Sequence, residues 1–510
     1  MIGRRGFLQS TGGAIAAGAA LSGVLGRAAR AAGNGTANCA GATISDGTLS
    51  RFRSRISGAV ILPSDSVYGS ARLVYNQRFD PYPSIIVRPG SESDIARSIE
   101  FARINGIRMV VRSGGHSYIG ASGGTGMVLD MSSMNAVAPL GDGMFRIGSG
   151  ARLKRVYGDL RCNGNWTIPC GSCDTVGFGG IAQGGGFGYL QRAAGLTCDR
   201  VRSARVVLAD GTAVDASPDA DADLYWAIRG GGGGSFGVAT QFDVEAIPYQ
   251  TLRVSLWYWP LSVAQQALEL MVDLQQSGEI PRTVTAALVF NVGAAALSPP
   301  QCVAVLFSTA SPAETVAIKQ LFVGSNGIPA TPGLGYDYDA ESPACDPMEV
   351  TEHAWYRAKS AMVYGAPASD TGEAIREWLQ RRLSDPLLGG SNYGSMNFLT
   401  LGGAVADVSP GDTAFPHRQS LLEVQFLGYL TQASPAAVRA NDHWIRGTYA
   451  DVFPRISLSG SGCYVNYCDD DLLESQWPGL YWGANYPRLQ ATKRRVDPAD
   501  FFRGRQTVRV

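Results

Sequence analysis

Two residues in this 510-residue chain combine reactive side chains with glycine-rich surroundings. His116 lies in the motif RSGGHSY at residues 112–118, and Cys173 lies in PCGSCDTVG at residues 169–177. An imidazole nitrogen and a thiolate are nucleophiles, and glycine-rich backbone lets a flat, phosphate-bearing ligand approach closely. The pair therefore predicts two covalent attachment points for a flavin, and with them a redox enzyme.

The same residues admit other interpretations. A lone histidine is more often structural than a ligand, but the Gly-Gly-His-Ser setting of His116 argues against that. Cys170 and Cys173 have the C-x-x-C spacing of a zinc or redox pair, yet no second Cys/His pair accompanies them, so we expect no metal. The run GGGFG at residues 184–188 could cradle a dinucleotide, but the full G-x-G-x-x-G spacing after a strand is not cleanly met, so an NAD site is less well supported.

Size and charge narrow the possible classes of protein. With 510 residues and 45% hydrophobic content, the chain exceeds what one compact core normally holds, which predicts two domains. The 43 basic and 43 acidic side chains give a formal net charge of zero and are well interspersed. A nucleic-acid partner is therefore not expected.

The N-terminus has the pattern of an export signal. Residues 3–9 read GRRGFLQ, residues 14–25 are mildly apolar and rich in Gly and Ala, and ARA at residues 29–31 supplies a small-x-small cleavage site. The apolar stretch is too short to span a membrane. We expect residues 1–32 to be a twin-arginine signal peptide and the protein to be secreted or periplasmic, with the export machinery as a partner.

The cysteine count agrees with export. Of nine cysteines, setting aside Cys173 leaves eight, an even number that fits disulfides outside the cytosol. The sequence leaves their pairing open.

The segment around His116 has the pattern of an α/β layer. Residues 85–89 predict a short buried strand, and the N-cap run 91–94 opens a helix over residues 95–105. A strand over residues 107–111 then leads directly into the His116 loop. Strand, helix and strand followed by a glycine loop are typical of a ligand-binding layer.

The composition changes near residue 250. Before it, the five glycines at 230–234 follow a strand-like run at 224–229, which favours tight turns over a flexible linker. The later segment has longer strand runs and amphipathic helices, at residues 254–258, 284–292 and 302–308 and at residues 264–277 and 435–449. We predict a flavin-binding domain over 45–248, a mixed α+β substrate domain over 249–450 and a C-terminal segment over 451–510.

Six ordered blocks resemble one family, the berberine-bridge-enzyme-like FAD-linked oxidases of the vanillyl-alcohol-oxidase fold. They are RSGGHSY (112–118), the segment 173–199, WAIR with its glycine run (226–234), FPHR (415–418), YVNYCD (464–469) and YWGANYPRL (481–489). The resemblance implies an α+β fold, with a two-subdomain FAD-binding domain and a substrate domain built on an antiparallel sheet. It also implies that residues 451–510 return to the FAD domain and the active site.

The cofactor that the resemblance implies is FAD, bonded through His116 to the 8α position and through Cys173 to C6. Cys170 lies where the family has a small residue, and Asp174 replaces a common proline. Val176 matches a position that the family associates with oxygen access, which favours an oxidase over a dehydrogenase. The resemblance assigns these further residues to the cofactor site: Arg112, Ser113, Gly114, Gly115, Ser117, Gly177, Gly179, Gly180, Gly184, Gly185, Gly186, Phe187, Gly237, Val238, Asn466 and Asn485.

The catalytic residues that the resemblance implies are Tyr467, Gln425 and Tyr118. A base for alcohol oxidation must accept the hydroxyl proton, and a phenol does so only if its pKa is lowered. We favour Tyr467 on an expected strand, where Tyr464 would point to the opposite face. Gln425 has the alternative of a solvent-facing strand residue.

The sequence thus predicts a secreted oxidase that removes hydride from a C–OH group of a sugar or a bulky natural product and passes electrons to O₂, giving H₂O₂. An oxidative cyclase or amine oxidase, a dehydrogenase with another acceptor and a non-catalytic flavin-binding protein are the alternatives. The partners are a small-molecule substrate and O₂, without stable membrane insertion. The exact substrate and the oligomeric state stay open.

Overall fold

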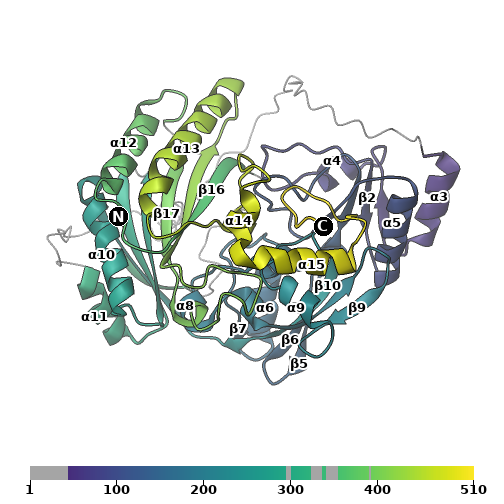
Figure 1. The fold of residues 1–510 in the computed structure, drawn as a ribbon, viewed down its shortest axis with the longest axis horizontal. Coiled ribbons are helices and arrows are strands. Elements are labelled where there is room, and N and C mark those ends of the chain that lie inside the picture. The colour runs from purple at the N-terminus through teal and green to yellow at the C-terminus, as the bar shows by residue number, and fades with distance from the viewer. Residues whose placement is uncertain (1–43, 294–299, 323–335, 341–353, 390–391) are drawn as a thin grey trace.

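A computed structural model describes residues 44–293, 300–322, 336–340, 354–389 and 392–510 (Figure 1). The helix α3 (Asp46–Arg55) begins this part of the chain. The predicted signal peptide lies outside the described residues, as do Cys39 and Cys345. No helix within the described ranges is long and apolar enough to cross a membrane.

The first sheet positions the His116 loop. Its strand order is β1-β2-β4-β3, with β2, β4 and β3 parallel and β1 antiparallel to β2. The strands are β1 (Ala59–Ile61), β2 (Ile85–Arg88), β3 (Met109–Arg112) and β4 (Met127–Asp130), and α5 (Glu92–Ile104) connects β2 to β3. The Ser91 side chain accepts a hydrogen bond from the Asp94 amide and caps α5, as the N-cap pattern predicted. The predicted order of strand, helix and strand before His116 is confirmed.

A second sheet, of five antiparallel strands, positions the cysteine loop. Its order is β5 (Val137–Gly141), β6 (Met144–Gly148), β10 (Val238–Glu245), β8 (Val201–Val207) and β9 (Ala213–Ala216). The helices α6 (Leu153–Cys162) and α7 (Phe178–Gly184) flank the loop that carries Cys173. Apolar side chains of this sheet and of both helices share one core, which fixes the loop ends.

The strand-like interpretation of residues 224–229 was wrong. These residues belong largely to the helix α9 (Ala222–Ala227), whose N-cap Asp221 accepts a hydrogen bond from the Leu224 amide. Its residues Leu224, Tyr225, Trp226 and Ala227 are all buried, so the short apolar run gave no helical periodicity to detect.

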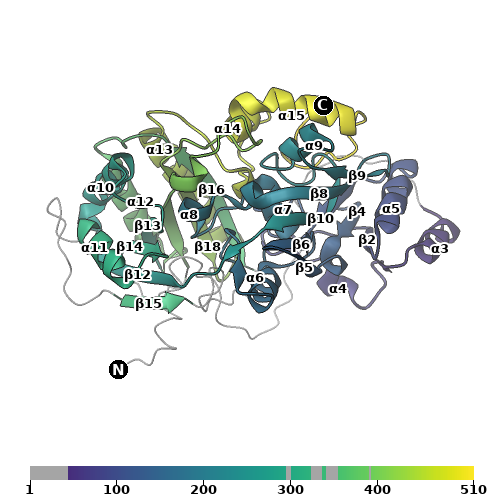
Figure 2. The same cartoon turned by 90° about the horizontal axis from the view of Figure 1, so that it is seen from below.

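The third sheet has seven antiparallel strands and forms the opposite half of the molecule (Figure 1). Its order is β15 (Tyr336–Ala340), β12 (Leu252–Pro260), β14 (Gln301–Ser308), β13 (Val284–Val292), β17 (Gly394–Thr400), β18 (Leu422–Leu430) and β16 (Trp355–Val363). The helices α10 (Ala264–Ser277), α11 (Pro312–Phe322), α12 (Thr371–Ser384) and α13 (Pro435–Ile456) cover its outer face (Figures 1 and 2). The predicted α+β class and the antiparallel sheet are confirmed.

The strand β18 contributes side chains to both faces of this sheet. On β18, Val424 and Phe426 pack into the core beneath the helices, whereas Glu423, Gln425 and Leu427 face a cavity on the inner side. Successive strand residues point to opposite faces, so a single strand serves both the core and the site.

The C-terminal segment returns across the molecule. The helices α14 (Trp477–Trp482) and α15 (Tyr486–Val496) lie beside the first half of the chain, and α15 packs against α9 (Figures 1 and 2). The buried Lys493 ammonium donates to Asp497 at 2.6 Å and to the Ser235 carbonyl at 2.7 Å. These bonds attach the C-terminal segment to Ser235, the residue that follows the glycine run 230–234. The exact domain boundaries stay a prediction.

The expected disulfides are not found among the described cysteines. All seven are free thiols. Six of them, Cys170, Cys173, Cys198, Cys302, Cys463 and Cys468, lie in the interior or in the cavity wall, whereas Cys162 is exposed. Most of these cysteines are thus buried as single apolar side chains rather than as members of a disulfide pair.

Candidate active site

A cavity of about 360 Å³ lies between the two halves of the molecule. One wall consists of glycine-rich loops from the first half, including residues 113–118, 171–180 and 231–235. The other wall is the inner face of the seven-stranded sheet, and residues 464–468 and 502–507 close the sides. His116 and Cys173 both line this cavity, so the structure brings together the two predicted attachment residues.

Two glycines hold the histidine and cysteine loops against each other. A Cβ atom on Gly114 would come within 2.2 Å of the Gly177 nitrogen, and one on Gly177 within 2.1 Å of the Gly114 nitrogen. Only glycine permits such an approach of two backbones. His116 Nε2 also shares a hydrogen bond of 2.9 Å with the Thr175 hydroxyl. The sequence motifs thus describe one packed unit.

The environments of the two nucleophiles differ. The His116 ring stacks on Tyr75, with ring centroids 4.0 Å apart and an angle of 16° between the planes. Burial and, to a smaller extent, the neighbouring Asp174 carboxylate raise the pKa of the Cys173 thiol to about 11. The thiol is therefore protonated at neutral pH, and its reaction requires a group that removes the proton.

The glycine wall fits a large, flat cofactor with phosphates. A Cβ atom on Gly180 or Gly234 would meet no protein atom within 4 Å, although both residues line the cavity. These positions therefore leave the space in front of the backbone open to a ligand. Glycine backbone with free space beside it lets a diphosphate approach the main chain closely.

Most residues predicted for the site lie in the cavity wall. The lining includes His116, Cys173, Ser113, Gly114, Gly115, Ser117, Val176, Gly177, Gly179, Gly180, Phe187, Gly237 and Asn466 among those predicted for the cofactor, together with Tyr118, Gln425 and Tyr467. Gln425 is on the inner face of β18, so the solvent-facing alternative was wrong. The roles of these residues stay predictions.

Six residues predicted to contact the cofactor lie outside the cavity wall: Arg112, Gly184, Gly185, Gly186, Val238 and Asn485. Arg112 is buried behind the loop, where its guanidinium donates to Asp130 at 3.0 Å. Val238 packs in the core of the first sheet. Asn485 donates to the carbonyls of Pro410 and Thr413 at 2.7 and 3.2 Å. These residues support the loops rather than line the site.

The glycines 184–186 allow the C-terminal segment to pack directly against the loop that contains them. A Cβ atom on Gly184 would lie 2.1 Å from Asn466 Oδ1, and one on Gly186, with φ of +92°, would lie 2.1 Å from the Thr197 hydroxyl. The Gly186 amide donates to Tyr464 Oη at 2.6 Å. This glycine run is therefore a docking point for residues 464–466.

The expected strand through Tyr464 and Tyr467 was wrong. Residues Val465–Tyr467 form a 3₁₀ helix, and the rings of Tyr464 and Tyr467 meet edge to face, 4.8 Å apart. Positions three apart eclipse in a 3₁₀ helix, so both rings face the cavity rather than opposite sides. Asn466 donates to Tyr464 Oη at 2.8 Å, so the Tyr464 hydroxyl has two donors already.

Three predicted catalytic side chains form a cluster. The rings of Tyr118 and Tyr467 stack with centroids 4.9 Å apart and planes 3° apart, and the Gln425 amide donates to the Tyr118 hydroxyl. Burial raises the pKa of Tyr467 well above its ordinary value, and the Glu423 carboxylate raises it further. This shift is opposite to the one that a tyrosinate base requires.

Sequence reasoning missed much of the sheet wall. The residues missed include Phe307, Tyr356, Asn397, Glu423 and Tyr429 on the sheet, and Tyr75 and Tyr189 in loops of the first half. No motif marks them, because they are alternate residues on long apolar strands or lie in ordinary loops. The glycines 231–234 and residues 502–507 were also missed, although the glycine run was a visible signal.

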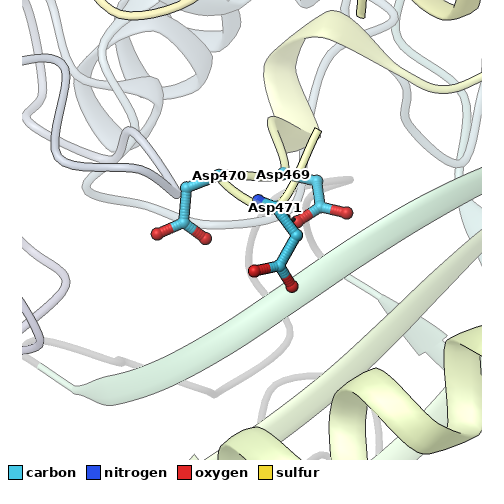
Figure 3. Close-up of side chains that lie close together, drawn as sticks. All are labelled: Asp469, Asp470 and Asp471. Atoms are coloured by element: carbon cyan, nitrogen blue, oxygen red, sulfur yellow. Dashed lines mark hydrogen bonds between the residues drawn. The ribbon is translucent and has the colours of Figure 1, made fainter. Parts of the chain in front are cut away.

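Three consecutive aspartates follow Tyr467 in the chain. One oxygen of each of Asp469, Asp470 and Asp471 lies within 4.8 Å of the others, and Figure 3 shows their carboxyl groups on one tight turn. Lys359 contacts Asp469 and Asp471 at 2.6 and 2.7 Å, and Arg357 contacts Asp470 and Asp471. The cluster therefore joins the Tyr467 segment to β16 by ion pairs.

His417 and Cys170 have structural surroundings. His417 is buried, shares hydrogen bonds with the Tyr364 hydroxyl and the Tyr481 carbonyl, and has its pKa lowered to about 4 by burial. Cys170 is buried outside the cavity wall, in contrast to Cys173. Both residues are thus placed to support the structure rather than to contact a bound ligand.

Comparison with known proteins decides the family. A family model described as "FAD binding domain" matches residues 83–217, and one described as "Berberine and berberine like" matches residues 463–509. Glucooligosaccharide oxidase of Sarocladium strictum is 30% identical over 461 residues, covering 84% of this chain and 87% of that protein. The chain belongs to the berberine-bridge-enzyme-like FAD-linked oxidoreductases.

Solved structures agree with this assignment. A glycopeptide hexose oxidase in complex with teicoplanin has a TM-score of 0.79 at 25% identity, covering 89% of this chain and 99% of that one. A structure of glucooligosaccharide oxidase from Acremonium strictum, whose FAD is described as 6-S-cysteinyl and 8α-N1-histidyl, has a TM-score of 0.77 at 25% identity, covering 88% and 97%. This berberine-bridge-enzyme-like chain thus has the predicted vanillyl-alcohol-oxidase fold.

Proposed function

We propose that this enzyme is a bicovalent FAD oxidase that oxidises a C–OH group of a carbohydrate or a glycosylated natural product and reduces O₂ to H₂O₂. One observation carries the proposal. His116 and Cys173 line the same cavity as the cluster of Tyr118, Gln425 and Tyr467. The attachment residues therefore share the cavity with side chains that can handle a proton, contributed by the histidine loop, by β18 and by the C-terminal segment.

The double attachment is supported by the packing of the two loops. The Gly114–Gly177 approach and the bond between His116 and Thr175 hold both nucleophiles toward one ligand. A structural relative with the same two residue types in its described linkage supports the same chemistry here. Two tethers would secure the cofactor while leaving the sheet side of the cavity to the substrate.

The sheet wall suits a substrate with both hydroxyl groups and apolar faces. Its aromatic rings include Phe307 of β14, on which Tyr189 from the first half stacks with centroids 3.6 Å apart. Its polar side chains include Gln425, Asn397 and Glu423. Aromatic surface with a few placed polar groups is typical of sites for such ligands. Relatives named as oligosaccharide and glycopeptide hexose oxidases support this substrate class.

The residues of this chain prepare the substrate for oxidation. Bound FAD supplies the acceptor for the hydride. Gln425 fixes the Tyr118 hydroxyl by its hydrogen bond, and Tyr118 fixes the plane of Tyr467 by stacking. Tyr467 then lies in position to take the proton of a substrate hydroxyl.

A substrate panel tests this function. Purified holoenzyme is offered oligosaccharides, glycosylated natural products, simple alcohols and benzylic amines, while peroxide and products are measured in air. We expect a lactone or ketone product and equimolar peroxide from a member of the first two classes. Oxidation of amines alone, with iminium-derived products, would instead support the amine oxidase or cyclase. Turnover that needs an artificial electron acceptor would support a dehydrogenase.

We further propose that the enzyme is exported through the twin-arginine pathway, on the basis of residues 3–9 and 29–31. Replacing Arg4 and Arg5 together by Lys keeps the charge but removes the recognition motif. We expect the double variant to stay in the cytoplasm with its N-terminus uncleaved, whereas the wild type is found outside it. Equal export of both proteins would contradict the proposal.

A further inference from the structure

Glu423 is a buried acid in the active-site wall with no partner of opposite charge. Its side chain is 4% exposed, and its Oε1 atom has no hydrogen-bond partner among the described residues. Glu423 is the one carboxylic acid that lines the cavity in the described part of the chain. An unpaired buried carboxyl group destabilises a protein, so its presence calls for a functional explanation.

Strand register places Glu423 beside the catalytic cluster. It precedes Gln425 by two positions on β18, so both side chains are on the inner face, about 7 Å apart along the strand. On the neighbouring strand β17, Leu399 pairs with Glu423 and Asn397 with Gln425. On β16, Met362 pairs with Glu423. The neighbours in register thus provide no charge to neutralise the acid.

The charged groups nearby are occupied elsewhere. Lys359 of β16 pairs in register with Phe426, not with Glu423, and its ammonium is bound to Asp469 and Asp471. Arg505, in the cavity wall, donates to the Ile119 carbonyl at 3.0 Å. The other titratable residues of the wall are His116, Cys173, Cys468, Tyr75, Tyr118, Tyr189, Tyr356, Tyr429, Tyr464 and Tyr467.

Tyr467 alone is poorly suited to accept a proton. Because burial raises its pKa well above the ordinary value, its hydroxyl is protonated at neutral pH and must release a proton in order to take one. Burial also raises the pKa of Glu423 to about 8, so this carboxyl group titrates near neutral pH. Of the groups that influence the Tyr467 phenol electrostatically, the Glu423 carboxylate has the largest effect.

We propose that Glu423 is the terminal proton acceptor of the reaction and that Tyr467 relays the proton to it. This inference rests on the proposed function. The substrate C–H bond breaks and its electron pair leaves with the hydrogen, as a hydride, to the oxidised flavin. The O–H bond breaks as the C=O bond forms, and that proton passes to the Tyr467 oxygen. The phenolic proton passes to the Glu423 carboxylate, directly after a side-chain rotation or through one water molecule.

The test compares Glu423→Gln, Glu423→Asp and Asn397→Ala with the wild-type holoenzyme. Gln keeps the shape of the side chain but cannot accept a proton, whereas Asp keeps the acid. Asn397→Ala is the matched control, because it removes a polar group from the same wall without removing a titratable one. Flavin reduction by the best substrate of the panel is measured without oxygen by stopped-flow absorbance, from about pH 5 to about pH 10.

We expect the wild-type reduction rate to rise about tenfold per pH unit below an apparent pKa near 8, because only the carboxylate accepts the proton. Glu423→Gln should lower the rate at alkaline pH by about a hundredfold and abolish the rise. Glu423→Asp and Asn397→Ala should both keep the rise, whatever their absolute rates. A Gln variant with a wild-type rate and pH profile, or with a raised KM alone, would overturn the inference.

A second readout does not depend on turnover. Infrared difference spectra between acidic and alkaline pH, taken for the wild type and for Glu423→Gln, report the carbonyl stretch of a protonated carboxylic acid. We expect one such band to titrate near pH 8 in the wild type and to be missing from the variant. If it titrates near the ordinary value of about 4.3, the inference fails. If no substrate reduces the wild-type flavin but the band behaves as expected, it is the proposed function that fails.

Discussion

The two walls of the cavity are built on different principles. The loop wall consists of backbone, with glycines such as Gly114, Gly177 and Gly180 bringing main chain to main chain or to the ligand. The sheet wall consists of side chains that stand out from β17 and β18, among them Asn397, Glu423 and Gln425. The first wall is suited to hold a cofactor common to a family, and the second to select a substrate.

This difference determines how each wall responds to change. A methyl group at Gly114 or Gly177, where two loop backbones touch, disturbs packing that cannot relax, whereas a change on the sheet wall alters one contact and leaves the strand in place. Substitutions on the loop wall should therefore affect folding and cofactor attachment. Those on the sheet wall should affect rate and pH dependence.

Loss of both tethers should have the largest effect. His116→Ala and Cys173→Ala should each leave a flavin attached by one bond, so acid-precipitated protein stays yellow. The double variant should release all of its flavin, because no covalent bond is left. The measurement is the absorbance of pellet and supernatant after precipitation, and complete release from either single variant would refute the double attachment.

Gly114→Ala should come next, as a folding defect. Its Cβ atom would lie 2.2 Å from the Gly177 nitrogen, and the resulting displacement should lower the unfolding free energy by about 3 kcal/mol or more. Gly158→Ala is the matched control, because its methyl group would meet open space on the exposed side of α6. Replacing a helix glycine there should stabilise the protein by about 0.5–1 kcal/mol.

Thermal or urea unfolding of the two variants, each without and with bound flavin, checks whether the unfolding free energy falls in the first and rises in the second. Equal stabilities for the Gly114 and Gly158 variants would mean that the two loops are not packed as tightly as the structure indicates.

The contrast between the walls also explains what could be predicted from the sequence. His116, Cys173 and their glycines could be found because close backbone approach admits one residue type, so the motif is visible without an alignment. The long strands and helices of the substrate half were equally accessible, from 284–292 to 264–277, because their apolar patterns are long.

What could not be predicted depends on tertiary contacts. Glu423 lies in an apolar strand run and has no local signal, since its exposure to the cavity depends on which face of the sheet the helices cover. The helix α9 is short and its last four residues, 224–227, are all buried, so its periodicity is lost. The 3₁₀ turn at Val465–Tyr467 is set by the docking of Tyr464 on Gly186, which joins residues 278 positions apart.

Tyr464 and Tyr467, at the edge of the sheet wall, should differ in role: the first supports the structure and the second takes part in the chemistry. Tyr467→Phe should lower the rate of flavin reduction by about a hundredfold, the scale of a lost proton-transfer group, while flavin attachment survives. Tyr464→Phe removes the acceptor of the buried Gly186 amide and should instead cost about 1–3 kcal/mol of stability.

Anaerobic stopped-flow reduction and thermal unfolding, applied to both variants, distinguish the two effects. If Tyr464→Phe is the slow enzyme and Tyr467→Phe is unchanged, the roles of the two residues are reversed.

The smallest effect is expected at Val176, a cavity-lining residue of the loop wall that is not a glycine and carries a small apolar side chain. If its small side chain leaves a path for O₂, reduced wild-type enzyme should reoxidise rapidly in air and release peroxide. Val176→Leu adds one methylene group to this path and should slow reoxidation several-fold, while the anaerobic reduction rate stays within about twofold, because the substrate side is untouched. Mixing reduced enzyme with aerated buffer in a stopped-flow instrument measures both steps. A wild-type flavin that stays reduced for minutes would show that O₂ is not the acceptor, and the site would then be that of a dehydrogenase.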